Sequence, residues 1–114
     1  MTKIKRPKEL PGKTREIETG CGSLYITINR LDNKPVEVFI RMGKQGSCIG
    51  CHVESLGRVI TLGLKYGVPL EEYSHHLENI RCNSPHMYPE EERTLSCADA
   101  VAKVLKEETK EEVN

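Results

Sequence analysis

Two stretches of the sequence, Leu24-Tyr-Ile-Thr-Ile-Asn29 and Val36-Glu-Val-Phe-Ile40, decide the fold. In each of them apolar and polar residues alternate, which is typical of a strand with one buried face. The segment 31–34 between them contains Asp32 and Asn33, which favour a tight turn. We therefore predict a β-hairpin with one buried face.

After this hairpin, apolar residues recur every three or four positions, which indicates a helix over 47–66. Ser47 suits the N-cap of this helix, and Gly67 suits its C-terminal stop. We expect Val59 and Leu62 to widen its buried apolar stripe. Two internal glycines predict a close approach by a neighbouring element or a ligand, because glycine otherwise weakens a helix. They are Gly57 and Gly63.

The remaining segments complete an α+β pattern. A first strand is predicted at 14–19, a second helix from Pro69 to about Ile80, and a third helix capped by Ser96. Strands followed by helices predict an antiparallel β-sheet of about three strands with the helices packed on one face. The predicted domain organisation is an extended N-terminal arm over residues 1–13, one domain over 14–106, and a charged C-terminal tail over 107–114.

The composition limits the classes of partner. A length of 114 residues fits one domain, and the formal net charge is zero. Bulk nucleic acid and membranes both attract a surplus of positive charge, so we expect neither as a partner. No apolar run approaches the roughly 20 residues of a membrane span, and charged residues follow Met1. We therefore expect a cytoplasmic location.

Several short motifs together resemble the TSCPD domain, which is found near the C-terminus of B12-dependent ribonucleotide reductases. The resemblance covers roughly residues 6–106 and departs from the family's name motif at Ala98. It implies a link to reductases, with a reductase as one candidate partner, but 114 residues cannot hold a reductase's catalytic machinery. We therefore expect no independent enzyme activity. The motifs are Arg6-Pro7, Leu10-Pro-Gly12, Leu24-Tyr-Ile-Thr-Ile-Asn29, Glu37-Val-Phe-Ile40, Gly43-Lys-Gln-Gly-Ser-Cys48, Glu54-Ser-Leu-Gly-Arg58, Gly67-Val68, Leu77-Glu-Asn-Ile-Arg-Cys82 and Ser96-Cys-Ala-Asp99.

A glycine-bounded segment before the predicted long helix is a candidate anion site. Backbone N–H groups at a helix N-terminus bind phosphate well, and arginine and lysine side chains would add to them. The segment lacks the Gly-Lys-Ser/Thr ending of a P-loop, so it is no Walker motif. The predicted ligand-binding residues are Gly43, Lys44, Gly46, Ser47, Arg58, Arg81 and Asn83.

Four of the five cysteines form a candidate metal site. Cys48 and Cys51 have the two-residue spacing of zinc ligands, and Cys82 with Cys97 would complete a tetrahedral set. The Cys48/Cys51 pair at a helix start also suits a redox dithiol. Buried, inert thiols are the third alternative. Zinc is therefore an expected cofactor only under the first of these readings.

The interpretation that we favour is a non-catalytic module that binds a small anionic ligand, a nucleotide or another phosphate-bearing molecule. A homo-oligomer is expected, because the core is short and the third helix has a small-residue face. Two alternatives remain open. One is a structural zinc-binding accessory domain of a ribonucleotide reductase, and the other is a free-standing phage-type protein that sequesters a signalling nucleotide.

Overall fold

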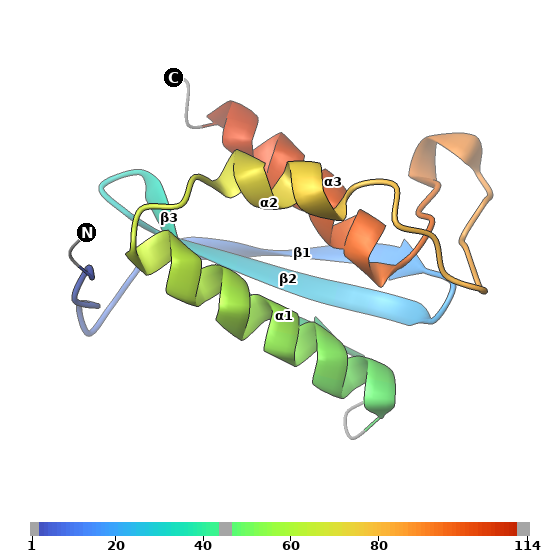
Figure 1. Ribbon diagram of the computed structural model, residues 1–114, viewed down its shortest axis with the longest axis horizontal. Coiled ribbons are helices and arrows are strands. Elements are labelled where there is room, and N and C mark those ends of the chain that lie inside the picture. The colour runs from blue at the N-terminus through green and yellow to red at the C-terminus, as the bar shows by residue number, and fades with distance from the viewer. Residues whose placement is uncertain (1–2, 44–46, 112–114) are drawn as a thin grey trace.

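The computed structural model describes residues 3–43 and 47–111. It contains a three-stranded sheet followed by helices (Figure 1). The strands are β1 (Gly12–Thr19), β2 (Gly22–Leu31) and β3 (Lys34–Met42). They are antiparallel and lie in the order β1-β2-β3. All three predicted strands are confirmed, each one slightly longer than the sequence indicates.

The turn between β2 and β3 has the conformation that its residues favour. Asp32 and Asn33 adopt positive φ angles of 51° and 67°. Two positive φ angles in the centre of a two-residue loop match the right-handed twist of a hairpin, and asparagine and aspartate tolerate them. This turn sets the register in which Ile28 lies opposite Val38.

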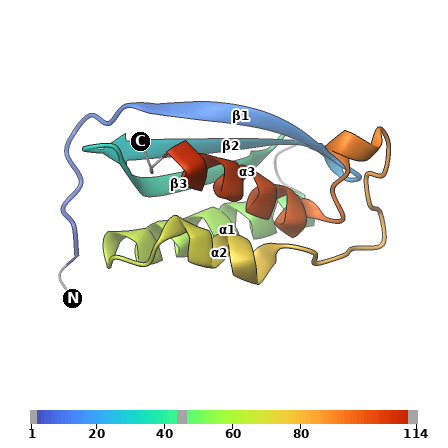
Figure 2. The same cartoon turned by 90° about the horizontal axis from the view of Figure 1, so that it is seen from above.

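All three α-helices lie on one side of the sheet, as Figure 2 shows from above. They are α1 (Cys48–Lys65), α2 (Leu70–Leu77) and α3 (Cys97–Glu111), and a short 3-10 turn, η1 (Glu90–Glu92), lies between the last two. The α+β class and the antiparallel sheet with helices on one face are therefore confirmed. No helix in the described ranges combines the length and apolar content of a membrane span.

The core lies between the inner face of the sheet and these helices. Alternate residues of β2 and β3 enter it, as the strand period requires. The helices add small and branched side chains, because no tryptophan is present and only one phenylalanine. The buried members are Leu24, Ile26, Ile28, Val38, Ile40, Met42, Val53, Ile60, Leu64, Leu70, Ala100, Val101, Val104 and Leu105.

The buried stripe of α1 is narrower than the sequence predicts. Val59 and Leu62 are 63% and 54% exposed, so the expectation that they widen it is wrong. The helix lies along β3 and buries only the side that carries Val53, Ile60 and Leu64. Val59 and Leu62 lie to one side of this buried stripe on the helix surface and consequently face outward.

The two internal glycines of α1 mark close approaches, as predicted. A Cβ atom on Gly57 would lie 3.1 Å from both the Ile40 nitrogen and the Val38 oxygen of β3. A Cβ atom on Gly63 would lie 1.7 Å from the Tyr73 hydroxyl of α2. Glycine therefore lets α1 contact the edge strand on one side and α2 on the other.

The end of the second helix differs from the predicted one. Helix α2 ends at Leu77, not near Ile80, because Asn79 takes a positive φ of 65° and its N–H donates to Asp99 Oδ1 at 2.8 Å. Helix α3 continues to Glu111, so residues 107–111 are helical. The first turn of α3 is as predicted, since the Asp99 N–H donates to Ser96 Oγ at 3.0 Å.

Candidate functional site: a groove between β3 and α1

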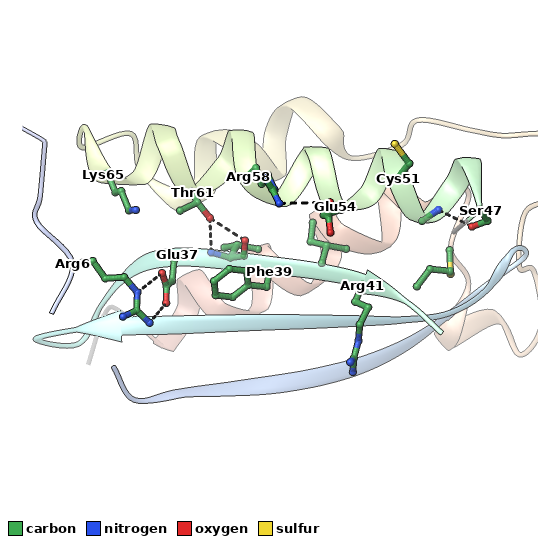
Figure 3. Close-up of a pocket in the computed structure, with 14 residues that line it drawn as sticks. Arg6, Glu37, Phe39, Arg41, Ser47, Cys51, Glu54, Arg58, Thr61 and Lys65 are labelled. Atoms are coloured by element: carbon green, nitrogen blue, oxygen red, sulfur yellow. Dashed lines mark hydrogen bonds and ion pairs between the residues drawn. The ribbon is translucent and has the colours of Figure 1, made fainter. Parts of the chain in front are cut away.

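The long helix α1 lies beside the edge strand β3, and an open groove of about 830 Å³ runs between them (Figure 3). Thr61 of α1 ties the two elements together. Its Oγ1 accepts a hydrogen bond from the Val38 N–H and donates to the Val38 oxygen, each at 2.9 Å. The outer backbone groups of Val38 are therefore satisfied by a helix side chain, which ties α1 to β3.

Positive side chains outnumber negative ones among the described residues that line this groove. The cations are Arg6, Arg41, Arg58 and Lys65, and the carboxylates are Glu37 and Glu54. Arg6 comes from the N-terminal arm, Arg41 from β3, and the other two cations from α1. Residues distant in sequence, such as Arg6 and Arg58, thus bring positive charge to one groove.

At one end of the groove, Arg6 and Glu37 form a bidentate ion pair. Arg6 Nε and Nη2 donate to the two carboxylate oxygens at 2.9 and 3.0 Å, and Asn29 Nδ2 donates to the same carboxylate at 2.7 Å. Burial raises the pKa of Glu37, but these bonds and the nearby Lys65 outweigh it and leave the pKa below its ordinary value. The buried carboxylate is therefore ionised at neutral pH and its charge is balanced by Arg6.

Arg58 is held much less firmly. Its guanidinium lies 3.8 Å from the Glu54 carboxylate, and both side chains are mostly exposed, at 79% and 66%. An exposed pair of this length contributes roughly 0.5 kcal/mol. Arg58 can therefore turn toward a ligand at little cost, whereas Arg6 cannot.

Arg41 occupies a different position. Its guanidinium lies 5.3 Å from the centre of the Tyr25 ring. Figure 3 shows the side chain extending away from α1, toward the open face of the sheet. Other polar side chains cover that face, including Thr14 and Thr27, whose hydroxyls lie 2.6 Å apart.

The predicted helix start is confirmed at Ser47. Its Oγ accepts a hydrogen bond from the Gly50 N–H at 2.9 Å, which is the N-cap bond expected of serine. Gly43 lies at the end of β3, where its N–H donates to the Ser23 oxygen at 3.1 Å. Lys44 and Gly46 lie outside the described residues.

The structure divides the predicted ligand residues into two groups. Ser47 and Arg58 line the groove. Arg81 and Asn83 lie on the exposed loop after α2 and are not part of it. Three groove residues were not predicted from the sequence: Arg6, Thr61 and Lys65. Thr61 and Lys65 are polar residues beside the apolar stripe of α1, and Arg6 lies in the N-terminal arm, so nothing local marked them as site residues.

The predicted cysteine set does not assemble around a metal. Within residues 3–43 and 47–111, no three histidine, cysteine, aspartate or glutamate side chains are placed to hold an ion. Cys48 and Cys51 are exposed on the first turn of α1. Cys82 and Cys97 instead lie near Cys21, which the predicted set did not include.

The segment Ser96-Cys-Ala-Asp99 has a clear structural role. Ser96 Oγ donates to the Ile80 oxygen at 2.5 Å, and Asp99 accepts from the N–H groups of Leu95 and Asn79 at 2.9 and 2.8 Å. Burial raises the pKa of Asp99, but these bonds and Lys103 outweigh it, so the pKa lies below its ordinary value. The segment therefore fixes the ends of α2 and α3 relative to each other.

The TSCPD domain family matches residues 2–109. The chain belongs to the TSCPD domain family. No solved structure matches this TSCPD domain.

Relatives of this TSCPD domain are much longer proteins. It is 38% identical over 76 residues to the vitamin B12-dependent ribonucleotide reductase of Streptantibioticus cattleyicolor, covering 66% of this chain and 13% of the reductase. The enzyme of the same name from Streptomyces clavuligerus is also 38% identical, over 66% of this chain and 8% of the length of that enzyme. The Rhodopirellula baltica enzyme is 44% identical, over 39% of this chain and 5% of the length of that enzyme. The chain thus spans a small fraction of these relatives.

Proposed function

We propose that this TSCPD domain is a non-catalytic module that binds a small phosphate-bearing ligand, with a nucleotide as the favoured class, in the β3–α1 groove. The observation that carries the proposal is the surplus of cations in a groove of about 830 Å³. Ligand sites in proteins commonly measure about 300–1,000 Å³. The size and the charge of the groove both suit such a ligand.

The cations of α1 would make the principal contacts with phosphate. Arg58 and Lys65 lie on the side of α1 that faces β3 (Figure 3). A guanidinium binds two phosphate oxygens at once, and an ammonium acts as a compact charge. The N-terminal turn of α1, capped by Ser47, adds the positive end of the helix dipole to the same groove. The paired Arg6 would shape the far end and contribute less binding energy.

The nucleotide class is supported by the relatives. They are named ribonucleotide reductases, which describes proteins that act on nucleotides. This chain spans 13% or less of the length of these three reductases, so we do not propose reductase activity itself for it. Binding without turnover fits a cytoplasmic domain that works alone or beside a larger enzyme.

Isothermal titration calorimetry tests the proposal with nucleoside mono-, di- and triphosphates and cyclic nucleotides. Arg58→Gln removes a groove cation, and Arg81→Gln is the matched control, since both arginines are exposed and only Arg58 lines the groove. We expect Arg58→Gln to weaken binding about tenfold, the loss of one charge-assisted hydrogen bond, and Arg81→Gln to leave it unchanged. Equal losses in both variants, or no binding of any nucleotide at millimolar concentration, would contradict the proposal.

Association with a B12-dependent ribonucleotide reductase is a second proposal. It is favoured by the 76 residues that match a segment of these longer proteins. Size-exclusion chromatography with light scattering tests it, and we expect the chain to elute together with the reductase. Separate peaks for the two proteins would contradict the association.

The same measurement on the chain alone tests the proposed homo-oligomer, for which a multiple of 12.9 kDa is expected. A monomeric mass would contradict the homo-oligomer.

A further inference from the structure

Three of the five thiols gather where three separate segments meet. Cys21 lies in the turn between β1 and β2, Cys82 in the loop after α2, and Cys97 at the first residue of α3. Figure 1 shows this turn, this loop and the start of α3 at the same end of the sheet. This arrangement was not evident from the sequence, in which the two-residue spacing of Cys48 and Cys51 was the stronger signal.

Thr19 connects two of these thiol-bearing residues. Its Oγ1 accepts a hydrogen bond from the Cys21 N–H at 3.1 Å and from the Cys97 thiol at 3.7 Å, and donates to the Gly22 oxygen at 2.8 Å. Burial raises the pKa of Cys97, the Thr19 hydrogen bond lowers it, and the nearby Cys21 and Cys82 thiols raise it, which leaves the pKa above its ordinary value. The side chain of Cys97 therefore faces the turn that carries Cys21.

The surrounding contacts hold the turn and the helix start in place. Thr94 Oγ1 donates to the Glu18 oxygen at 3.0 Å, which ties the residues before α3 to β1. A Cβ atom on Gly20 would lie 1.5 Å from the Ser84 oxygen, so the turn and the loop are in direct contact. The Cys82 sulfur accepts a hydrogen bond from the Ser84 N–H at 3.3 Å, which directs it toward its own loop.

We infer that Cys21 and Cys97 form a reversible disulfide when the protein meets a peroxide. Cys21 is exposed and Cys97 is half-buried, so Cys21 is the thiol that a peroxide reaches first. The Cys21 thiolate attacks one peroxide oxygen, the O–O bond breaks, and the released hydroxide is protonated to water, leaving a sulfenic acid. Cys97 then loses its proton and attacks the Cys21 sulfur, and the S–O bond breaks to release a second water. Two thiols thus lose two electrons while hydrogen peroxide is reduced to two waters, and a dithiol reverses the step.

Such a disulfide would join the β1–β2 turn covalently to the start of α3. Cross-links that close a long stretch of chain stabilise chiefly by restricting the unfolded state. We therefore expect the melting temperature of the oxidised protein to rise and to return on addition of dithiothreitol. The inference does not depend on ligand binding in the groove, and the two can fail separately.

Mass spectrometry of the full chain after treatment with hydrogen peroxide tests the inference. We expect the mass to fall by two hydrogen atoms, a digest to contain a linked Cys21–Cys97 peptide, and the titratable thiols to fall by two. Cys97→Ser should abolish the internal disulfide, while the matched control Cys48→Ser should retain it. A disulfide between Cys48 and Cys51 or between Cys82 and Cys97, one that joins two chains, or a chain that keeps all its thiols would overturn the inference.

Discussion

The hydroxyl of Thr61 lies 2.9 Å from both the nitrogen and the oxygen of Val38. One side chain of α1 therefore replaces, at this residue, the strand that would otherwise lie beside β3. An edge strand usually exposes such backbone groups to water or to another chain. Here the contact satisfies the outer backbone groups of Val38 and ties α1 to β3.

Removing this hydroxyl should weaken the contact between α1 and β3. Thr61→Val keeps the branched shape but leaves the Val38 N–H and oxygen without their partner, at an expected cost of about 2 kcal/mol. Thr61→Ser is the control, because it retains the hydroxyl. Urea unfolding measures both variants. A valine variant as stable as the wild type would show that water replaces the two bonds at no cost.

The contact between Gly63 and Tyr73 should respond to paired substitutions. Gly63→Ala places a methyl group against the Tyr73 hydroxyl, so the Tyr73 ring must leave its position or the two helices must shift. We expect a loss of about 1–2 kcal/mol, even though alanine favours the helix by roughly 1 kcal/mol. Tyr73→Phe in the same chain removes the closest atom and should restore most of the stability. A double variant no more stable than Gly63→Ala would contradict this account.

Asp99 should make the stability of the fold depend on pH. Burial raises its pKa, but hydrogen bonds from Leu95, Asn79 and Lys103 lower it below its ordinary value of 3.8 overall. A carboxyl whose pKa is lower in the folded state stabilises the fold above its unfolded pKa and loses that contribution as the pH falls through its folded pKa. Asp99→Asn should therefore cost about 2 kcal/mol at neutral pH, and the difference from wild type should shrink below about pH 4.

The other aspartate of the chain provides the control for this prediction. Asp32 lies exposed in the β2–β3 turn, so Asp32→Asn should leave the unfolding free energy unchanged within about 0.5 kcal/mol at every pH. Denaturant unfolding from about pH 6 to about pH 3 gives both profiles. A constant difference between wild type and Asp99→Asn over this range would show that charge is not what Asp99 contributes.

Glu108 should stabilise the packing of α3 on the sheet. Its carboxylate is 1% exposed and lies 3.1 Å from Lys13, 3.8 Å from Arg15 and 3.6 Å from Arg30. Glu108→Gln leaves the partly exposed Lys13, Arg15 and Arg30 without the buried carboxylate that they share, at an expected cost of about 2 kcal/mol. Glu107→Gln is the matched control, since Glu107 is 57% exposed and should cost less than about 1 kcal/mol. Equal effects in thermal unfolding would place the stabilising charge elsewhere.

Most of the fold was predictable because its signals are local. The alternation in β2 and β3, the Asp32–Asn33 turn and the Ser47 cap each act within a few residues. The end of α2 was not predictable, because Asn79 is held there by Asp99, which is twenty residues distant in the sequence. The exposure of Val59 likewise depends on where α1 lies against β3, which no local pattern states.

The candidate site was predictable only where it coincides with a helix. Ser47 caps α1 and Arg58 lies on it, and the local sequence pattern predicts both positions. Arg6 reaches the groove through its ion pair with Glu37, across 31 positions of sequence. The gathering of Cys21 with Cys97 depends in the same way on the packing of a turn against a distant helix. Contacts of this kind follow from the tertiary structure alone.

The central claim is that the β3–α1 groove binds a nucleotide. Amide NMR of the isotope-labelled full chain, titrated first with inorganic phosphate and then with adenosine triphosphate, tests it most directly. We expect saturable shifts that concentrate on amides lining the groove, such as those of Gly50, Arg58 and Thr61, and that are larger with the nucleotide than with phosphate. Shifts centred on Arg81 and Asn83, or no saturable shift with either titrant, would contradict it.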